Sequence, residues 1–174
     1  TLVFKPAIDT REGTDKCLIS SRAGDMQVAG DFIPSDPTLY QVFIKNLTEN
    51  LKNPANPHIS AIFIDEAQFL TKDQVEDFYK IVHIFQTPVL CYGLKNNFKS
   101  KLFEGSKRLL ELADDFQEIR CICHCGKRAK QNARVINNKL VKSGEEIVIG
   151  NNEVANEVHY VSLCNDCYFH GKIK

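Results

Sequence analysis

Ala61-Ile62-Phe63-Ile64-Asp65-Glu66-Ala67-Gln68-Phe69 is the stretch of this chain that decides its fold. Its first four residues are apolar and run directly into two carboxylates, Asp65 and Glu66. A short apolar run of this kind is typical of a strand buried on both faces of a parallel sheet. Carboxylates at the C-terminal end of such a strand lie where open α/β sheets bind ligands. If the strand continues, the two side chains point to opposite faces, so one can hold a metal ion while the other moves a proton.

Strand and helix patterns alternate on both sides of this stretch. Apolar runs predict strands at 2–4, 59–64, 89–92 and 117–122, and the polar segment 8–29 is expected to be a loop with room for one short strand. A helix is predicted after an N-cap at Asp36, a second after a capping box at Thr71 and Gln74, and a third that ends near residue 114. This alternation predicts a mostly parallel sheet. The buried stripes expected on the first two helices are Leu39, Val42, Phe43, Leu47 and Leu51, and Val75, Phe78, Tyr79, Val82 and Phe85.

The composition limits the possible classes of protein. The chain has 174 residues, which suits one domain or one domain with a small appendage. Lysine plus arginine number 22, and so do aspartate plus glutamate, so no general attraction to nucleic acid or acidic membranes is expected. No apolar run approaches the roughly 20 residues that a membrane span needs.

Five of the seven cysteines fall in two clusters, at 121–125 and 164–167. Clustered cysteines without a secretory signal are more often metal ligands than disulfides, and they favour a cytoplasmic location. A closed tetrahedral zinc site would stabilise the small, loop-rich appendage after residue 125, where short strands are predicted at 147–149 and 158–163. The single residue between the first two ligands is an unusual spacing, so Cys121 and His124 are competing ligands. Buried free cysteines are the alternative. The expected zinc ligands are Cys123, Cys125, Cys164 and Cys167.

The motifs of this chain, in their order, resemble those of the cytoplasmic (type II) thymidine kinases, in particular the enteric-bacterial branch. The resemblance covers nearly the whole chain, and the Cys-x-Cys knuckle is usual in that branch. It implies a RecA-like parallel sheet of the P-loop type over residues 1–120 and a small zinc-binding lobe with a lasso loop over residues 121–174. The matching blocks are 8–11, 20–22, 65–69, 88–94, 98, 102–106, 123–126, 148–150 and 160–164.

The resemblance implies an enzyme of nucleotide salvage for DNA synthesis, which transfers the γ-phosphoryl group of ATP to the 5′-hydroxyl of thymidine with Mg²⁺. Glu66 suits the general base, because a carboxylate within hydrogen-bond reach can accept the proton of the nucleophile. Asp65 matches a Walker-B-type acid that would hold Mg²⁺ through water, and Gln68 would complete the nucleotide-contact segment. By resemblance Asp9 and Arg11 lie close to the triphosphate, where an arginine stabilises charge on the transferred group.

The resemblance places the thymidine pocket in the second lobe. Backbone amides and carbonyls of the lasso loop would read the edge of the thymine base, and two aromatic side chains would contact the nucleoside. The alternative is that these aromatic residues only pack. The family also suggests a homotetramer with thymidine and ATP as its ligands and no nucleic-acid or membrane partner. The residues matched are Ile147, Val148, Ile149 and Gly150 in the loop, with Phe98 and Tyr160 as the aromatic contacts.

A Gly-x-x-x-x-Gly-Lys-Ser/Thr loop, which this family carries ahead of the strand at 2–4, does not occur in these 174 residues. The backbone amides of such a loop cradle the phosphates, and its lysine reaches the β- and γ-phosphates. We expect this loop, with its strand and first helix, to lie upstream of Thr1. A polypeptide of these residues alone is therefore expected to have no kinase activity.

Two other classes of protein fit parts of the sequence. A RecA-like ATPase, such as a helicase-type motor with a zinc ribbon that binds nucleic acid, would share the acidic box at 65–68. Zero net charge and the short distance from this box to the cysteine clusters disfavour it. A non-catalytic zinc-bearing regulator with a decayed nucleotide site is disfavoured by the intact Asp65, Glu66 and Arg11.

Overall fold

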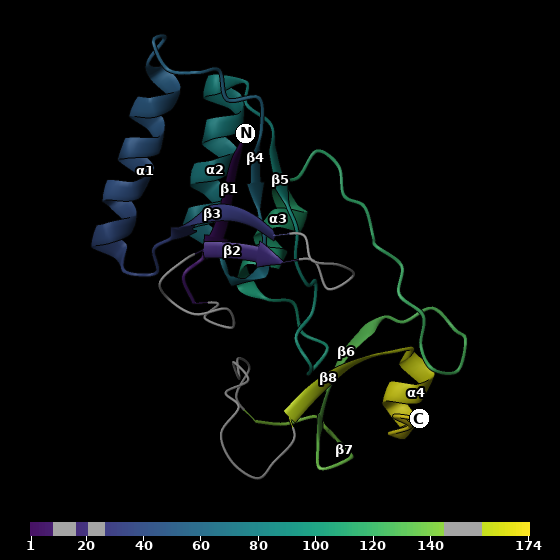
Figure 1. Cartoon of the computed structure of the whole chain (residues 1–174). Helices are drawn as coiled ribbons and strands as arrows, with labels where there is room; N and C mark the ends of the chain where they lie inside the picture. The colour runs from purple at the N-terminus through teal and green to yellow at the C-terminus, as the bar shows by residue number, and fades with distance from the viewer. Residues whose placement is uncertain (9–16, 21–26, 145–157) are drawn as a thin grey trace. The chain divides into compact units, whose positions relative to one another are not determined.

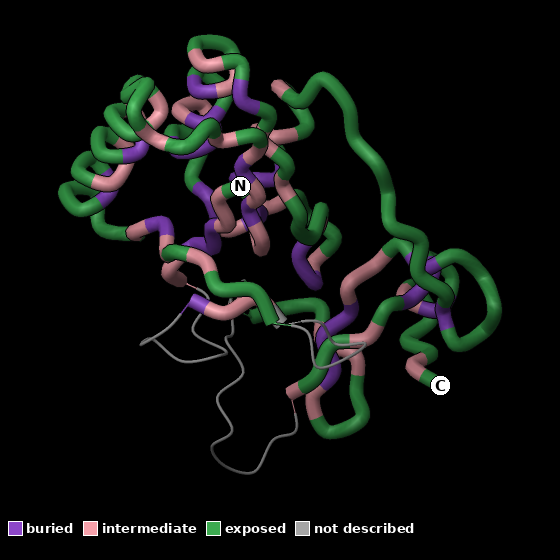
Figure 2. Tube along the Cα trace, turned by 45° about the horizontal axis from the view of Figure 1, so that its top comes forward, coloured by how far each residue is buried: buried purple, intermediate pink, exposed green. Residues whose placement is uncertain are grey.

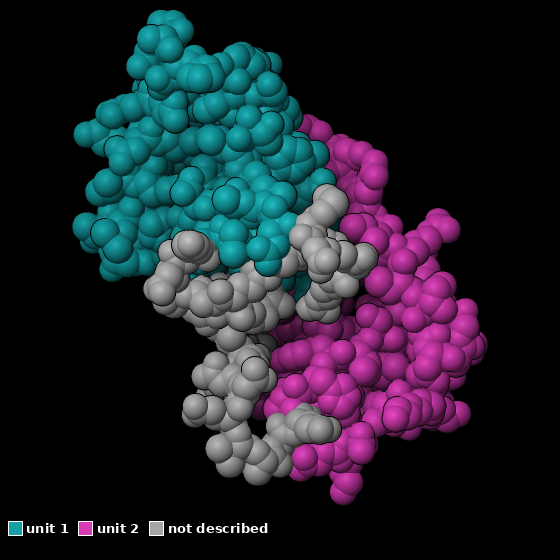
Figure 3. Space-filling view, in the orientation of Figure 1, with its two compact units in different colours: residues 1–94, 104–112 teal, residues 95–103, 113–174 magenta. Residues whose placement is uncertain are grey.

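The computed structural model describes residues 1–8, 17–20, 27–144 and 158–174. The chain divides into two compact units, coloured separately in Figure 3. Unit 1 comprises Thr1–Leu94 and Glu104–Leu112, and unit 2 comprises Lys95–Phe103 and Ala113–Lys174. The division predicted at residue 120 differs from this one, because the segments 95–103 and 113–120 group with the cysteine-rich part of the chain.

Unit 1 is built on a five-stranded sheet of order β2-β3-β1-β4-β5 (Figure 1). Strand β1 pairs in parallel with β3 and β4, and β4 pairs in parallel with β5, whereas β2 lies antiparallel to β3 at one edge. The prediction of a mostly parallel α/β sheet is therefore confirmed. The strands are β1 Leu2–Pro6, β2 Cys17–Ser20, β3 Gln27–Ile33, β4 Ile62–Ile64 and β5 Val89–Cys91.

The prediction of a loop with one short strand over residues 8–29 is wrong in part, because two strands form there. Cys17–Ser20 forms β2, and Gln27–Ile33 forms β3, whose pairing with β1 makes it an inner strand. Most of the side chains of β3 are exposed or half-buried, and only Ile33 at its end is buried. Such a strand carries a weak apolar pattern, because its hydrogen bonds rather than burial of its side chains hold it in the sheet.

The described residues of unit 1 form three α-helices, α1 Pro37–Lys52, α2 Lys72–Phe85 and α3 Glu104–Leu112, and a short 3₁₀ turn, η1 Ala67–Phe69. The Asp36 carboxylate accepts hydrogen bonds from the amides of Thr38 and Leu39 (3.0 and 2.9 Å), as expected for the N-cap of α1. The capping box of α2 is also confirmed, because the Gln74 amide N–H donates to the Thr71 hydroxyl and the Thr71 N–H donates to the Gln74 side chain.

The core of unit 1 forms where α1 and α2 pack on the sheet, and in Figure 2 the buried residues (purple) of this unit gather in its interior. The Phe4 ring of β1 lies 5.2 Å from the Phe43 ring of α1 and 6.4 Å from the Phe78 ring of α2. The predicted stripes are wrong in part. Leu39, Val42 and Tyr79 are exposed, and Tyr40 and Ile81 are buried in their place. Each helix has apolar residues on more than one side, and the sheet decides which side is covered.

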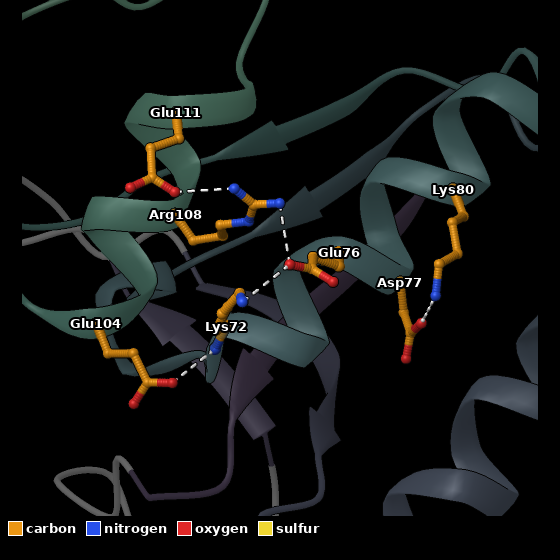
Figure 4. A network of polar contacts seen from close by, with 7 residues as sticks. All are labelled: Lys72, Glu76, Asp77, Lys80, Glu104, Arg108 and Glu111. Atoms are coloured by element: carbon orange, nitrogen blue, oxygen red, sulfur yellow. Dashed lines mark hydrogen bonds and ion pairs between the residues drawn. The ribbon is translucent and has the colours of Figure 1, made fainter.

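Ion pairs hold α3 against α2 (Figure 4). The Arg108 guanidinium contacts the Glu76 carboxylate at 2.9 Å and the Glu111 carboxylate at 2.8 Å. The Lys72 backbone N–H at the start of α2 donates to the Glu104 carboxylate (2.9 Å) at the start of α3. These contacts fix the start of α3 beside η1, which directly follows the two carboxylates.

In its described part, unit 2 contains a three-stranded antiparallel sheet of order β7-β6-β8 and one helix, α4 Asn165–His170. Its strands are β6 Gln131–Ile136, β7 Lys139–Val141 and β8 Val158–Leu163. The prediction of a strand at 158–163 is confirmed, whereas the segment predicted as a strand at 147–149 lies outside the described residues. The central strand β6 was not predicted, because its buried apolar residues, Ala133 and Val135, are few and lie in a polar, basic segment.

The prediction of a strand at 117–122 is wrong. Ile122 forms an isolated antiparallel bridge with Arg128, and the side chains of Phe116, Ile119 and Ile122 are exposed. No strand in the described part of the chain pairs along this segment, so its apolar residues have no sheet to pack into. Among the described residues, no helix is both long enough and apolar enough to cross a membrane.

Candidate functional site

The two carboxylates that follow β4 lie in a turn at the end of its ladder. The Tyr92 N–H donates to the Ile64 carbonyl, and the Ala67 N–H donates to the Tyr92 carbonyl, both at 2.8 Å. Tyr92, in the segment that follows β5, therefore pairs on both sides of Asp65 and Glu66, which are looped out between these two bonds. The alternation expected of a continuing strand does not apply, because β4 ends at Ile64.

The backbone of Glu66 is in the left-handed region, with φ 51° and ψ 36°. This conformation costs a residue with a side chain roughly 1–2 kcal/mol relative to the right-handed region. The hydrogen bonds of Tyr92 and a bond from the Asp65 N–H to the Phe4 carbonyl (2.9 Å) hold the turn in place. A disfavoured backbone that its surroundings enforce is a frequent feature of functional sites.

The turn lies at the carboxyl edge of the parallel strands β1, β4 and β5, where open α/β sheets bind ligands. Asp65 and Glu66 are half-buried. Lys5 was not predicted as a residue of this site. It is 5% exposed and follows Phe4, the register partner of Ile64. A lysine inside an apolar strand was the available signal, since a buried cation requires compensating interactions.

Gln68 is almost fully buried, with 3% of its surface exposed. Its side-chain Nε2 donates to Oε2 of Glu66 at 2.5 Å, and its Oε1 accepts from the backbone N–H of Leu94 at 3.0 Å. The structure thus brings Asp65, Glu66 and Gln68 together in unit 1. The other two residues predicted near the triphosphate, Asp9 and Arg11, lie outside the described residues.

The two predicted aromatic contacts of the nucleoside belong to unit 2 and differ in exposure. Phe98 is 1% exposed, and the guanidinium carbon of Arg134 lies 3.6 Å from the centre of its ring. Tyr160 on β8 is 42% exposed and is the register partner of Arg134 on β6. The Tyr168 hydroxyl donates to the Phe98 carbonyl at 2.6 Å, which fixes the backbone of this loop. The predicted loop residues Ile147, Val148, Ile149 and Gly150 lie outside the described residues.

Four of the five clustered cysteines come together in unit 2. The sulfur atoms of the group lie within 4.8 Å of one another. Cys121 is exposed and lies outside the group, and the His124 ring contacts the Lys172 carbonyl at 3.2 Å, so neither competing ligand takes part. The members of the group are Cys123, Cys125, Cys164 and Cys167.

The local structure presents these sulfurs from two turns. The first pair lies in a turn closed by a bond from the Cys123 N–H to the Lys127 carbonyl at 2.9 Å. The second pair lies at the start of α4, where Cys164 is the N-cap and its sulfur accepts from the Cys167 N–H at 3.4 Å. Four sulfurs presented in this way are compatible with a tetrahedral metal ion such as structural Zn²⁺.

The ionisation of these thiols also favours a bound cation. Burial opposes ionisation of Cys123, but hydrogen bonds from the backbone of Cys125 and Cys164 and from neighbouring thiols outweigh it and lower its pKa to about 6. Burial and the neighbouring thiols raise the pKa of Cys167 to about 12. Ionisation of one thiol in the group therefore opposes ionisation of the next. A bound cation is needed before all four can ionise.

Together, these features define an α/β protein of the open-sheet class with an acidic turn at its carboxyl edge and a four-cysteine unit. The chain belongs to the thymidine kinase family, because the sequence model described as "Thymidine kinase" matches residues 1–168. The chain is 42% identical over 164 residues to the thymidine kinase of Enterobacteria phage T4, a match that covers 94% of this chain and 77% of that protein.

Bacterial relatives agree with this assignment. The chain is 42% identical over 177 residues to the thymidine kinase of Mannheimia succiniciproducens, with 100% of this chain and 80% of that protein covered. It is 42% identical over 175 residues to the thymidine kinase of Legionella pneumophila, with 99% of this chain and 76% of that protein covered. The family predicted from the motifs is therefore confirmed.

Proposed function

We propose that this protein is a thymidine kinase, which transfers the γ-phosphoryl group of ATP to the 5′-hydroxyl of thymidine to give dTMP. Membership of the family and the name shared by the three relatives support this activity. The observation that carries it is the acidic turn at 65–66, where two half-buried carboxylates stand at the ligand-binding edge of a parallel sheet. The family assignment does not favour the alternative function, a RecA-like ATPase of the helicase type that binds nucleic acid.

In this proposal Glu66 is the general base. Its carboxylate accepts the proton of the 5′-hydroxyl as the 5′-oxygen bonds to the γ-phosphorus. The bond from the γ-phosphorus to the bridging oxygen breaks, and ADP leaves with that oxygen. Asp65 would hold Mg²⁺, which when bound neutralises charge on the phosphate oxygens. Its position at the end of β4, next to the base, fits a carboxylate that faces the triphosphate. Asp9 and Arg11 are proposed to lie near the same phosphates on the resemblance alone.

The thymidine pocket is proposed to use Phe98, Tyr160 and the loop segment 147–150. The exposure of Tyr160 fits a ring that is available to a nucleoside, whereas Phe98 is already packed against Arg134. The four cysteines are proposed to hold a structural Zn²⁺. The RecA-like P-loop architecture, the cytoplasmic location and the homotetramer are proposals that rest on the family resemblance.

Replacement of the proposed base tests the function directly. In the full-length protein, we expect Glu66→Gln to lower kcat for thymidine phosphorylation by about 10²- to 10⁴-fold, because an amide cannot accept the proton. Glu49→Gln is the matched control, since Glu49 is exposed on α1 and its ion pair with Lys45 is a long contact (3.9 Å). Unchanged turnover in Glu66→Gln would rule out this residue as the base.

The two classes of enzyme are separated by the ligand that stimulates ATP consumption. A thymidine kinase consumes ATP by transferring its γ-phosphoryl group to thymidine, whereas a motor hydrolyses ATP in response to a polynucleotide. Stimulation by single-stranded DNA without stimulation by thymidine would contradict the proposed function.

A further inference from the structure

Gln68 links the proposed base to a neighbouring segment of the sheet. Its amide nitrogen donates to Oε2 of Glu66, and its amide oxygen accepts from the backbone N–H of Leu94, 26 residues further along the chain. A carboxylate can only accept and a backbone N–H can only donate, so these two partners admit one orientation of the amide group. The side chain is 3% exposed, so water does not compete for these bonds.

The anchor of this link is itself held in place. The Leu94 carbonyl accepts from the Ser106 hydroxyl of α3 at 2.7 Å, and α3 is fixed to α2 by the ion pairs of Arg108. The backbone at Gly93 approaches the amide so closely that a methyl group there would lie 2.3 Å from Oε1 of Gln68. The Gln68 amide therefore lies between the backbone at Gly93 and Leu94 on one side and the Glu66 carboxylate on the other.

The carboxylate of the proposed base, Glu66, needs a neighbouring group that fixes its orientation. Glu66 has a long side chain on a looped-out, left-handed backbone, so its own backbone does little to confine the carboxylate. A general base must stand within about 2.6–3.2 Å of the proton that it removes. A displacement of about 1 Å can lower the rate by about 100-fold.

We propose that Gln68 is a positioning residue, which orients the Glu66 carboxylate toward the 5′-hydroxyl and does not itself contact the nucleotide. The proposal rests on the proposed role of Glu66 as general base. It replaces the expectation that Gln68 contacts ATP or Mg²⁺, because both ends of its buried amide are already engaged within the protein. Gly93 contributes to this positioning, since only a residue without a side chain leaves room for the Gln68 side-chain amide.

The sharpest test is Gln68→Glu in the full-length protein. Glutamate has nearly the same shape and keeps an oxygen for the Leu94 N–H, but it places a second carboxylate against Glu66 where a donor stood. We expect kcat to fall by about 10- to 100-fold and the KM values for thymidine and ATP to change by less than about threefold. Gln68→Met removes the amide without adding charge and should also lower kcat.

Gln74→Glu is the matched control. Gln74 is also buried, with 7% exposed, and its amide also accepts from one backbone N–H (Thr71) and donates to one acceptor, the Pro34 carbonyl. The same chemical change there should lower the melting temperature and leave kcat within about twofold of the wild type. Gly93→Ala supplies an independent variant, since its methyl group displaces the Gln68 amide without changing the chemistry of the glutamine.

A double-mutant cycle separates positioning from a merely structural role. In the Glu66→Gln background the base is gone, so Gln68→Glu should change the residual kcat by less than about twofold. A role in folding alone would lower kcat equally in both backgrounds.

Three outcomes would overturn the inference. They are a wild-type kcat in Gln68→Glu, a rise of tenfold or more in the KM for ATP with kcat unchanged, and additive effects in the cycle. Loss of activity in Glu66→Gln together with full activity in the Gln68 and Gly93 variants would reject the positioning role and leave the proposed function standing. Full activity in Glu66→Gln would reject both.

Discussion

Removal of one sulfur from the four-cysteine group should destabilise unit 2 more than any other single substitution at its surface turns. Cys164→Ser takes away one of four sulfurs that lie within 4.8 Å of one another. Serine keeps an acceptor for the Cys167 N–H at the N-cap of α4, so the helix cap survives and the loss is that of a metal ligand. The variant therefore isolates the contribution of the metal.

The apolar core around this group is small. Apart from the cysteines, its buried side chains are those of Ala129, Ala133 and Leu163, with four partly buried side chains packed against them, those of Leu140, Val161, Tyr168 and Ile173. Burial of one leucine contributes about 1.5–3 kcal/mol and an alanine less, so the three together contribute on the order of 4 kcal/mol. A structural zinc contributes about 10–16 kcal/mol at neutral pH, so the metal is the larger stabilising contribution. We expect unit 2 to lose its cooperative unfolding when the metal is lost.

The measurements are the zinc content of the purified protein and its thermal unfolding with and without a strong chelator. The wild type should hold about one zinc per chain, and Cys164→Ser should hold much less and unfold at a lower temperature. Cys121→Ser is the control, because Cys121 is exposed and lies outside the group. Retention of zinc and Tm by Cys164→Ser, or loss of both by Cys121→Ser, would refute the assignment.

Three further predictions concern single residues. Burial and the nearby Asp77 carboxylate raise the pKa of Tyr40, so above pH ~10 the unfolded chain loses a proton that the native state keeps. The free energy of unfolding should therefore fall by up to about 1.4 kcal/mol per pH unit above this pH. Urea unfolding at several pH values should show this fall in the wild type and not in Tyr40→Phe. Gly30→Ala would place a methyl group 2.7 Å from a β1 carbonyl oxygen and should cost about 1–3 kcal/mol, which an unchanged Tm would contradict. Arg134→Lys loses the flat guanidinium that lies 3.6 Å from the Phe98 ring, so the KM for thymidine should rise by about 2- to 30-fold. Equal rises for thymidine and ATP would argue against a pocket role.

Features that depend on neighbouring residues could be predicted from the sequence. The apolar run before Asp65 predicted a central strand, because burial on both faces requires such a run. The capping box at Thr71 predicted the start of α2, because its hydrogen bonds join residues three apart. The spacing of Cys164 and Cys167 predicted one half of the four-sulfur group, since two residues between cysteines is a common spacing of zinc ligands.

Features that depend on distant partners required the tertiary structure. Tyr40 rather than Leu39 is buried on α1, because the sheet selects one of several apolar sides of the helix. The geometry around Glu66 depends on Tyr92, which brackets the turn, and the orientation of Gln68 depends on Leu94. By itself, the sequence determined the kind of fold, the family and the groups available for chemistry. Only the tertiary structure decided which groups touch, because hydrogen bonds between strands far apart in the chain leave no periodic pattern in it.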